Sequence, residues 1–126
     1  MINDKSNWSL DMSAGPIFEQ IAKNVHQMLA RGALMPGDKL PSARDLAAKL
    51  SVNPNTIVHA YNELEANGVI EKRRGLGTFV REDAPVTGMK KDMLHQAANA
   101  YADEGRQLDA SIKEAIAALK EVWDVS

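Results

Sequence analysis

The sequence of 126 residues contains no cysteine, and this absence excludes three kinds of site. Without a thiol there is no disulfide, no thiolate-bound zinc and no cysteine nucleophile. No apolar run approaches the roughly 18 residues that a membrane-spanning helix needs. Residues 3–7 are polar, which argues against a secretory signal segment. These absences predict a cytoplasmic protein that folds without covalent cross-links.

A surplus of positive charge is also missing, because the formal net charge is −2. Residues 1–83 alone hold ten basic and ten acidic side chains. This balance argues against a protein that coats nucleic acid without regard to sequence. It is compatible with a sequence-specific reader, because local field and geometry decide specific binding.

Helical periodicity is present in three segments of the first half of the chain. Ser42 and Asn53 are capping residues ahead of two of these segments, and Pro16 and Pro54 suit first helical positions, where a missing N–H costs nothing. Gly68 suits the left-handed conformation just past a helix end. The apolar spacing and these caps predict helices over residues 16–31, 42–49 and 54–67.

A β-hairpin is predicted for residues 69–80, because two short strands flank the turn Arg74-Gly75-Leu76-Gly77. Helical spacing then returns in segments 89–103 and 108–125, with a break expected at Gly105. The predicted fold is mainly α with a small β-hairpin, a winged helix-turn-helix domain followed by a short two-helix tail. The expected bounds are 1–83 for the domain, 84–88 for a linker and 89–126 for the tail.

Two short helices joined by a tight turn are how small proteins place one helix in the major groove of DNA. The polar face of the third helix carries Asn55, His59 and Asn62, whose amide and imidazole groups suit base edges. The N–H groups at the start of that helix suit a phosphate. Arg44 is placed to approach the backbone or a guanine, and the run Lys72-Arg73-Arg74 is placed to approach phosphates or the minor groove. Together these features predict DNA binding.

Each of these residues also has an ordinary structural explanation. Asn53 is a good helix cap whether or not it contacts DNA. An exposed polar helix face suits solvent, and Arg44 can pair with Asp45 or Glu63 on the surface. The basic hairpin can serve as solubilising charge at a sheet edge. The joint occurrence of these features in one layout is what favours DNA.

No catalytic or metal-binding constellation is recognisable. Gly75 and Gly77 join two strands, whereas a phosphate-cradling glycine loop follows a strand and opens a helix. His26, His59 and His95 stand far apart in the sequence, and the carboxylates show no pairing with a nucleophile. We predict no enzyme activity, no cofactor and no metal. The alternative function is a winged-helix module for protein–protein interaction.

Three connected motifs carry a resemblance to a known family. They read Leu40-Pro41-Ser42-x-Arg44-x-Leu46-Ala47, Val52-x-x-x-Thr56-Ile57-x-x-Ala60-Tyr61-x-x-Leu64-x-x-x-Gly68 and Gly75-x-Gly77-Thr78-x-Val80. Together they resemble the N-terminal domain of the GntR family of bacterial transcription regulators. The resemblance implies DNA contacts from Ser42, Arg44, Asn53, Asn55, Thr56, Arg74 and Gly75, to which we add His59 and Gly77. Family members frequently place Lys or Arg near His59.

The tail distinguishes subfamilies. Most members carry a large effector-binding or aminotransferase-like domain, whereas only about 45 residues follow the wing here. A two-helix tail resembles the YtrA subfamily, which implies dimerisation, repression and a link to ABC-transporter genes. A small-molecule effector stays open, although such a tail leaves little room for a large cavity.

The tail also has a physical reason to pair. A two-helix appendage cannot bury a long apolar stripe by itself, and covering each large side chain is worth roughly 1.5–3 kcal/mol. A second copy is the simplest cover, and packing against the helix at 16–31 is the alternative. The predicted interface comprises Met93, Ala97, Tyr101, Leu108, Ile112, Ile116, Leu119, Val122 and Trp123. A dimer predicts a palindromic operator with half-sites roughly 34–36 Å, or a multiple, apart.

Overall fold

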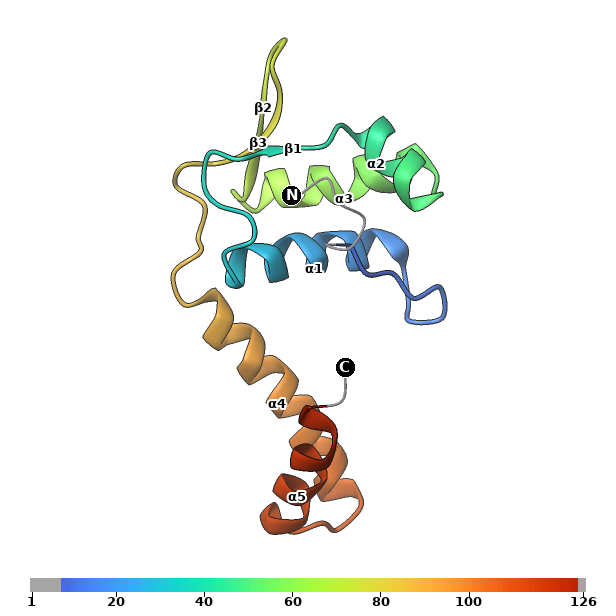
Figure 1. Cartoon of the computed structure of the whole chain (residues 1–126), viewed down its shortest axis with the longest axis vertical. Coiled ribbons are helices and arrows are strands. Elements are labelled where there is room, and N and C mark those ends of the chain that lie inside the picture. The colour runs from blue at the N-terminus through green and yellow to red at the C-terminus, as the bar shows by residue number, and fades with distance from the viewer. Residues whose placement is uncertain (1–7, 125–126) are drawn as a thin grey trace. The chain divides into compact units, whose positions relative to one another are not determined.

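The computed structural model describes residues 8–124 (Figure 1). The chain divides into two compact units, residues 1–90 and 91–126. The polar residues 3–7, which we used against a signal segment, lie outside the described part. The last two residues of the predicted tail lie outside it as well. Within residues 8–124, no helix is both long and apolar enough to cross a membrane.

The first unit contains three helices that pack around one apolar core. They are α1 (Ile17–Ala30), α2 (Ala43–Leu50) and α3 (Pro54–Ala66), and each end lies within one residue of the predicted bound. Ser42 Oγ accepts a hydrogen bond of 3.1 Å from the backbone N–H of Asp45 and so starts α2. Asn53 Oδ1 accepts one of 2.8 Å from the N–H of Asn55 and starts α3. Local capping therefore fixes where both helices begin.

A small antiparallel sheet accompanies the helices. Its strands are β1 (Lys39–Leu40), β2 (Ile70–Arg73) and β3 (Gly77–Val80), in the order β1-β3-β2. The hairpin pairs Ile70 with Val80 and Arg73 with Gly77. Strand β1, which pairs with β3, was not predicted. Its two residues are too few to show a periodicity, and a partner distant in sequence defines it.

The core of the first unit lies mainly between α1 and α3, and strand residues and Trp8 close it. Asn24 is the buried polar residue within this core among residues 8–124. Its Oδ1 accepts a hydrogen bond of 2.7 Å from the N–H of Ser9, and its Nδ2 donates to the carbonyls of Ser9 and Gln20. The fully buried large side chains are Ile21, Val25, Met28, Leu29, Leu34, Leu40, Leu46, Ile57, Leu64, Val69, Ile70 and Val80.

The second unit is a pair of helices, α4 (Met89–Gln107) and α5 (Ile112–Trp123). The expected break at Gly105 is wrong, because this residue lies inside α4. A glycine inside a helix costs only about 1 kcal/mol relative to alanine, and the helix tolerates it. The turn forms instead at Asp109, which has a φ of 56°. Leu108 therefore precedes α5 rather than starting it.

A capping box sets the start of α5. The N–H of Glu114 donates to Ser111 Oγ at 3.1 Å, and the N–H of Ser111 donates to Glu114 Oε1 at 2.9 Å. Two backbone donors are thus satisfied at the helix end. The apolar spacing from Leu108 onward predicts one continuous helix, and it therefore obscures the Ser111–Glu114 capping box in the sequence.

Candidate nucleic-acid interface

Helix α3 presents an apolar side to the core and a polar side outward. Ile57, Ala60, Tyr61 and Leu64 are buried. The outward side carries Asn55, Val58, His59 and Asn62, all of them exposed. In Figure 1, α3 lies between α1 and the strands of the wing. The first unit thus leaves one long side of α3 uncovered by its own residues.

The start of α3 combines capping and exposed groups. The side-chain oxygen of Asn53 is engaged by its helix, whereas the side chain of Asn55 is exposed and has no hydrogen-bond partner among residues 8–124. Thr56 is half-buried. The first turn therefore offers one unengaged amide, that of Asn55, beside the positive end of the helix dipole.

The start of α2 lies beside this surface and carries two exposed polar residues. Ser42 Oγ accepts a hydrogen bond as the helix cap, and its hydroxyl group keeps a proton to donate. Arg44 is exposed and forms no ion pair within the described residues, so neither Asp45 nor Glu63 holds it. The cation of Arg44 thus remains available for a partner outside the domain.

His59 is fixed by a contact that the sequence did not reveal. Its imidazole stacks on the ring of Phe18 in α1, with ring centroids 3.9 Å apart and planes 12° apart. His59 consequently marks the α1 edge of the exposed face rather than its middle. Val58, whose side chain is 40% exposed, lies on the other side of that face. A pattern of polar, base-reading residues does not include Val58, so the sequence does not predict its place on this face.

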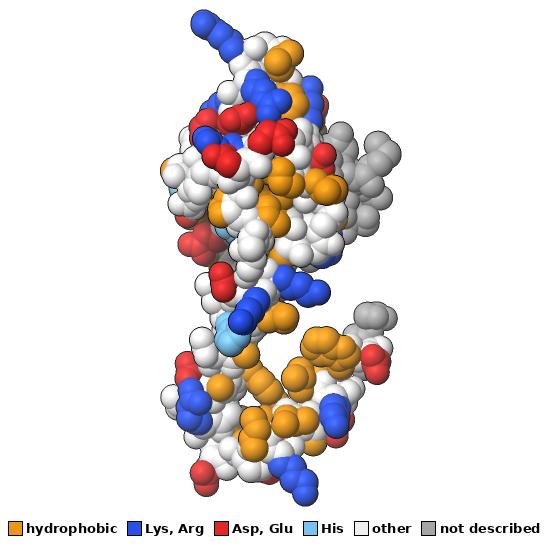
Figure 2. Space-filling view, turned by 90° about the vertical axis from the view of Figure 1, so that its left-hand side faces the viewer, with side chains coloured by type: hydrophobic (Ala, Val, Ile, Leu, Met, Phe, Trp, Pro, Cys, Tyr) orange, Lys and Arg blue, Asp and Glu red, His pale blue; other side chains and the backbone are white. Residues whose placement is uncertain are grey.

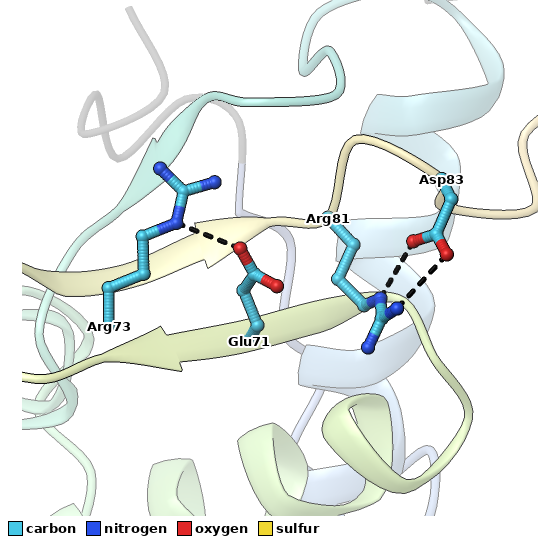
Figure 3. A network of polar contacts seen from close by, with 4 residues as sticks. All are labelled: Glu71, Arg73, Arg81 and Asp83. Carbon is cyan, nitrogen blue, oxygen red and sulfur yellow. Dashed lines mark hydrogen bonds and ion pairs between the residues drawn. The ribbon is translucent and has the colours of Figure 1, made fainter.

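The three basic residues of the wing have different surroundings. Arg73 Nε donates to Glu71 Oε2 at 2.8 Å (Figure 3). The guanidinium of Arg73 also lies 4.3 Å from the centre of the Phe79 ring. Lys72 Nζ lies 3.4 Å from Asn62 Oδ1. Arg74, in the turn, is exposed and unpaired within the described part of the chain. Within the described residues, the basic run therefore comprises one cation without an internal partner, Arg74, one that is ion-paired, Arg73, and one that has only long, exposed contacts, Lys72.

The glycines of the wing have separate roles. Gly75 has a φ of 76°, and the position of an added Cβ is open, so the tip can approach another molecule closely. Gly77 has a φ of 119°, and an added Cβ would lie 2.8 Å from Cε of Lys39. The stem of Lys39 thus lies next to Gly77, at the start of β3 directly after the turn of the wing. Lys39 was also missing from the predicted site, because β1 was unrecognised.

A second ion pair follows the wing at the end of β3. Arg81 donates two hydrogen bonds to the carboxylate of Asp83, at 2.7 and 3.0 Å (Figure 3). These hydrogen bonds hold the pKa of Asp83 below its ordinary value and raise the pKa of Arg81. Arg81 is thereby neutralised locally. Within residues 8–124, no group of three histidine or acidic side chains is placed to hold a metal ion.

The predicted interface residues of the tail remain uncovered within their own unit. None of the residues of α4 and α5 is buried. Tyr101 Oη donates to the carbonyl of Ala115 at 2.7 Å and joins the two helices. Met93 is half-buried and Ala97 is exposed. Figure 2 shows hydrophobic side chains at the surface of this unit. The exposed large apolar residues are Leu94, Tyr101, Leu108, Ile112, Ile116, Leu119, Val122 and Trp123.

Three helices, a tight α2–α3 turn and a β2–β3 hairpin define a winged helix-turn-helix domain. Domains of this class bind DNA through the exposed second helix of the motif, which is α3 here. The sequence model described as "Bacterial regulatory proteins, gntR family" matches residues 17–80. The chain belongs to this GntR family. The predicted fold class and family are confirmed, and the chain is a DNA-binding transcription regulator.

Individual relatives extend this assignment. The chain is 48% identical over 75 residues to the HTH-type transcriptional repressor YtrA of Bacillus subtilis, a match that covers 60% of this chain and 58% of YtrA. A GntR family transcriptional regulator from Listeria monocytogenes has a similar structure, with a TM-score of 0.78 and 36% identity over 90% of this chain and 99% of that one. The DNA-binding domain of AraR, solved in complex with operator ORX1, matches with a TM-score of 0.50 and 27% identity, covering 56% of this chain and 86% of that one.

Proposed function

We propose that this regulator is a homodimeric repressor that binds an approximately palindromic operator, as the resemblance to the YtrA subfamily implied. The observation that carries the proposal is the uncovered polar side of α3 beside an open, cationic wing tip. Repression is supported by the similarity to the repressor YtrA, and operator binding by the similarity to AraR. Control of ABC-transporter genes belongs to the same proposal, as does action in the cytoplasm, where bacterial DNA lies.

In this proposal α3 enters the major groove. Asn55 pairs with adenine, which presents a donor and an acceptor to an amide, and Asn62 reaches the same groove further along the helix. His59, held by Phe18, donates to guanine or to a phosphate at the groove edge. Ser42 and the N–H groups at the start of α3, around Asn53 and Thr56, contact the backbone.

The wing and α2 complete the proposed contacts. Arg74 enters the minor groove or meets a phosphate beside it, and Gly75 lets the backbone of the turn come close. Gly77, directly after the turn, leaves space for the stem of Lys39. Arg44 has no internal partner and is placed for the backbone or a guanine.

The exposed stripe of the tail supports a second copy as partner. Leaving six large apolar side chains of residues 108–123 in water is unfavourable, and patches of this kind mark interfaces. A two-fold dimer would present two α3 helices to half-sites roughly 34–36 Å, or a multiple, apart. An effector that changed the spacing of the two helices would lower operator affinity.

Selection of bound fragments from the source genome with the purified full chain tests this function. We expect enriched fragments with a two-fold symmetric site, and a footprint that covers both half-sites. Asn55→Ala should cost about 1–3 kcal/mol of binding at particular base pairs and leave other positions unaffected. If no fragment is enriched, or if Asn55→Ala and His59→Ala both bind as tightly as the original chain, the assignment of α3 to the groove is wrong.

A further inference from the structure

We infer that a groove between α3, the start of α2 and the strands of the wing binds the sugar–phosphate backbone of one DNA strand, with Lys39 and Lys72 as its phosphate contacts. This inference rests on the proposed binding of α3 to DNA and deepens it. Neither Lys39 nor Lys72 is among the DNA-contacting residues that the family resemblance implies.

The groove has an apolar floor. Its volume is about 330 Å³, and Leu40, Ala43, Val58 and Tyr61 line it together with polar residues at the rim. The hydroxyl group of Tyr61 donates to the carbonyl of Pro41 at 2.8 Å, so Tyr61 presents its ring rather than a polar atom. The floor therefore offers no hydrogen-bonding pattern that would select a base.

Lys39 contributes the first cation of the rim. Its stem passes next to Gly77, where the missing side chain leaves room for it, since an added Cβ would lie 2.8 Å from Cε. Within residues 8–124, no acidic side chain pairs with the Lys39 ammonium group. Lys39 also lines the groove. The stem of Lys39 thus lies against the wing, and its charge is not neutralised by the described residues.

Lys72 contributes the second cation, from strand β2. Its Nζ lies 3.4 Å from Asn62 Oδ1 and 4.0 Å from Glu65 Oε1. The side chains of Lys72 and Glu65 are 58% and 41% exposed, so solvent screens this pair and it holds the lysine weakly. A phosphate competes well for such an ammonium group, because contact releases condensed counterions from DNA.

The position of the groove identifies the occupant. One side of it borders the exposed face of α3, which is proposed to read the major groove. The other side borders the hairpin whose tip is proposed to reach the minor groove. A single strand of the duplex separates these two grooves, and it must cross the surface between α3 and the wing. Alternating sugars and phosphates match an apolar floor with cations at the rim.

The test removes positive charge from the protein by substituting lysines in the full chain, and it removes negative charge from the DNA by replacing single phosphates with neutral linkages. Lys39→Ala and Lys72→Ala are each compared with the original chain for operator binding at several salt concentrations. We expect each substitution to weaken binding about threefold to tenfold for all operator sequences alike, and to reduce the slope of log K against log[salt] by about one per protomer. Lys39→Arg should restore the slope.

A methylphosphonate scan then locates the contact. One neutral linkage in the strand that borders the two grooves should weaken the original chain, but should not weaken the Lys39→Ala, Lys72→Ala double variant further. Lys23→Ala, which removes a charge from α1, is the matched control and should leave the slope unchanged. Thermal melting of each variant checks that the fold is intact.

Three outcomes separate the possibilities. Unchanged slopes in both lysine variants, with intact operator binding, overturn the groove inference and leave the proposed function standing. An equal loss in Lys23→Ala also overturns it, because general charge would then explain the effect. Failure of the original chain to bind any operator overturns the proposed function, and the groove inference with it.

Discussion

The imidazole of His59 stacks on the ring of Phe18, with centroids 3.9 Å apart, and this contact joins α1 to α3, the helix that we propose reads DNA. The stack limits the rotation of an exposed side chain before any DNA is bound. Immobilising a free side chain on binding costs about 0.5–1.5 kcal/mol, and the stack removes part of that cost in advance.

Phe18→Leu should therefore weaken operator binding about twofold to tenfold. The loss should depend on the partner, so that His59→Ala and the double variant bind alike in fluorescence anisotropy titrations. Phe18→Tyr keeps an aromatic ring and serves as the control that retains affinity. If Phe18→Leu weakens the His59→Ala protein as much as the original, Phe18 acts by some other route.

Arg74 and Arg73 form a matched pair of adjacent wing cations with different surroundings. Arg74→Ala should weaken binding about threefold to tenfold for every operator sequence, because it removes an unpaired cation from the tip. Arg73→Ala should weaken binding less, since Glu71 already neutralises that guanidinium. Gel shifts on an operator and on a scrambled sequence measure both effects. Equal losses from the two substitutions would contradict the separate surroundings found for them.

His26 predicts a loss of stability as the solution becomes mildly acidic. Its side chain is half-buried in α1, and desolvation lowers its pKa below the usual 6.5, although the charge of Glu63 acts in the opposite direction. The unfolded chain therefore binds a proton more readily than the folded chain. Neutral His26 contributes fully to the free energy of unfolding above about pH 7.5. This contribution is lost as the pH falls through 6.5, the pKa in the unfolded chain, toward the lower pKa of His26 in the folded chain.

Urea unfolding of the original chain and of His26→Gln, at pH 7.5 and at about pH 5.5, measures this effect. The free energy of unfolding should fall more between these two pH values for the original chain than for His26→Gln. An equal fall in both proteins would show that His26 is not the group responsible.

A charge within the exposed stripe of α5 should disrupt the proposed dimer. Ile116→Asp places a carboxylate among the apolar side chains and should shift sedimentation toward a monomer. Operator affinity should then fall by about a hundredfold or more, because the second half-site no longer adds its contribution. Ala117→Asp adds the same charge outside the stripe and should leave the dimer intact. A monomeric original chain would exclude this arrangement.

Local signals explain what could be predicted from sequence. Ser42 and Asn53 cap their helices through neighbours two or three residues away, so their role as helix caps could be predicted from the sequence. Strand β1 and the Phe18–His59 stack depend on contacts between distant segments, which no periodicity records. The sequence shows a basic run from Lys72 to Arg74 but does not show that Arg73 pairs with Glu71, because ion pairing depends on side-chain direction. Gly105 failed as a breaker because neighbouring helix-forming residues outweigh one glycine.

The two arginine–carboxylate pairs beside the wing, Arg73 with Glu71 and Arg81 with Asp83, bear on how a target is located in a chromosome (Figure 3). A genome offers about a million or more competing sites, and attraction to them grows with the unneutralised charge on a protein. By cancelling two cations internally, the domain is held less on irrelevant DNA. A larger share of the regulator molecules in the cell then stays free to bind the operators.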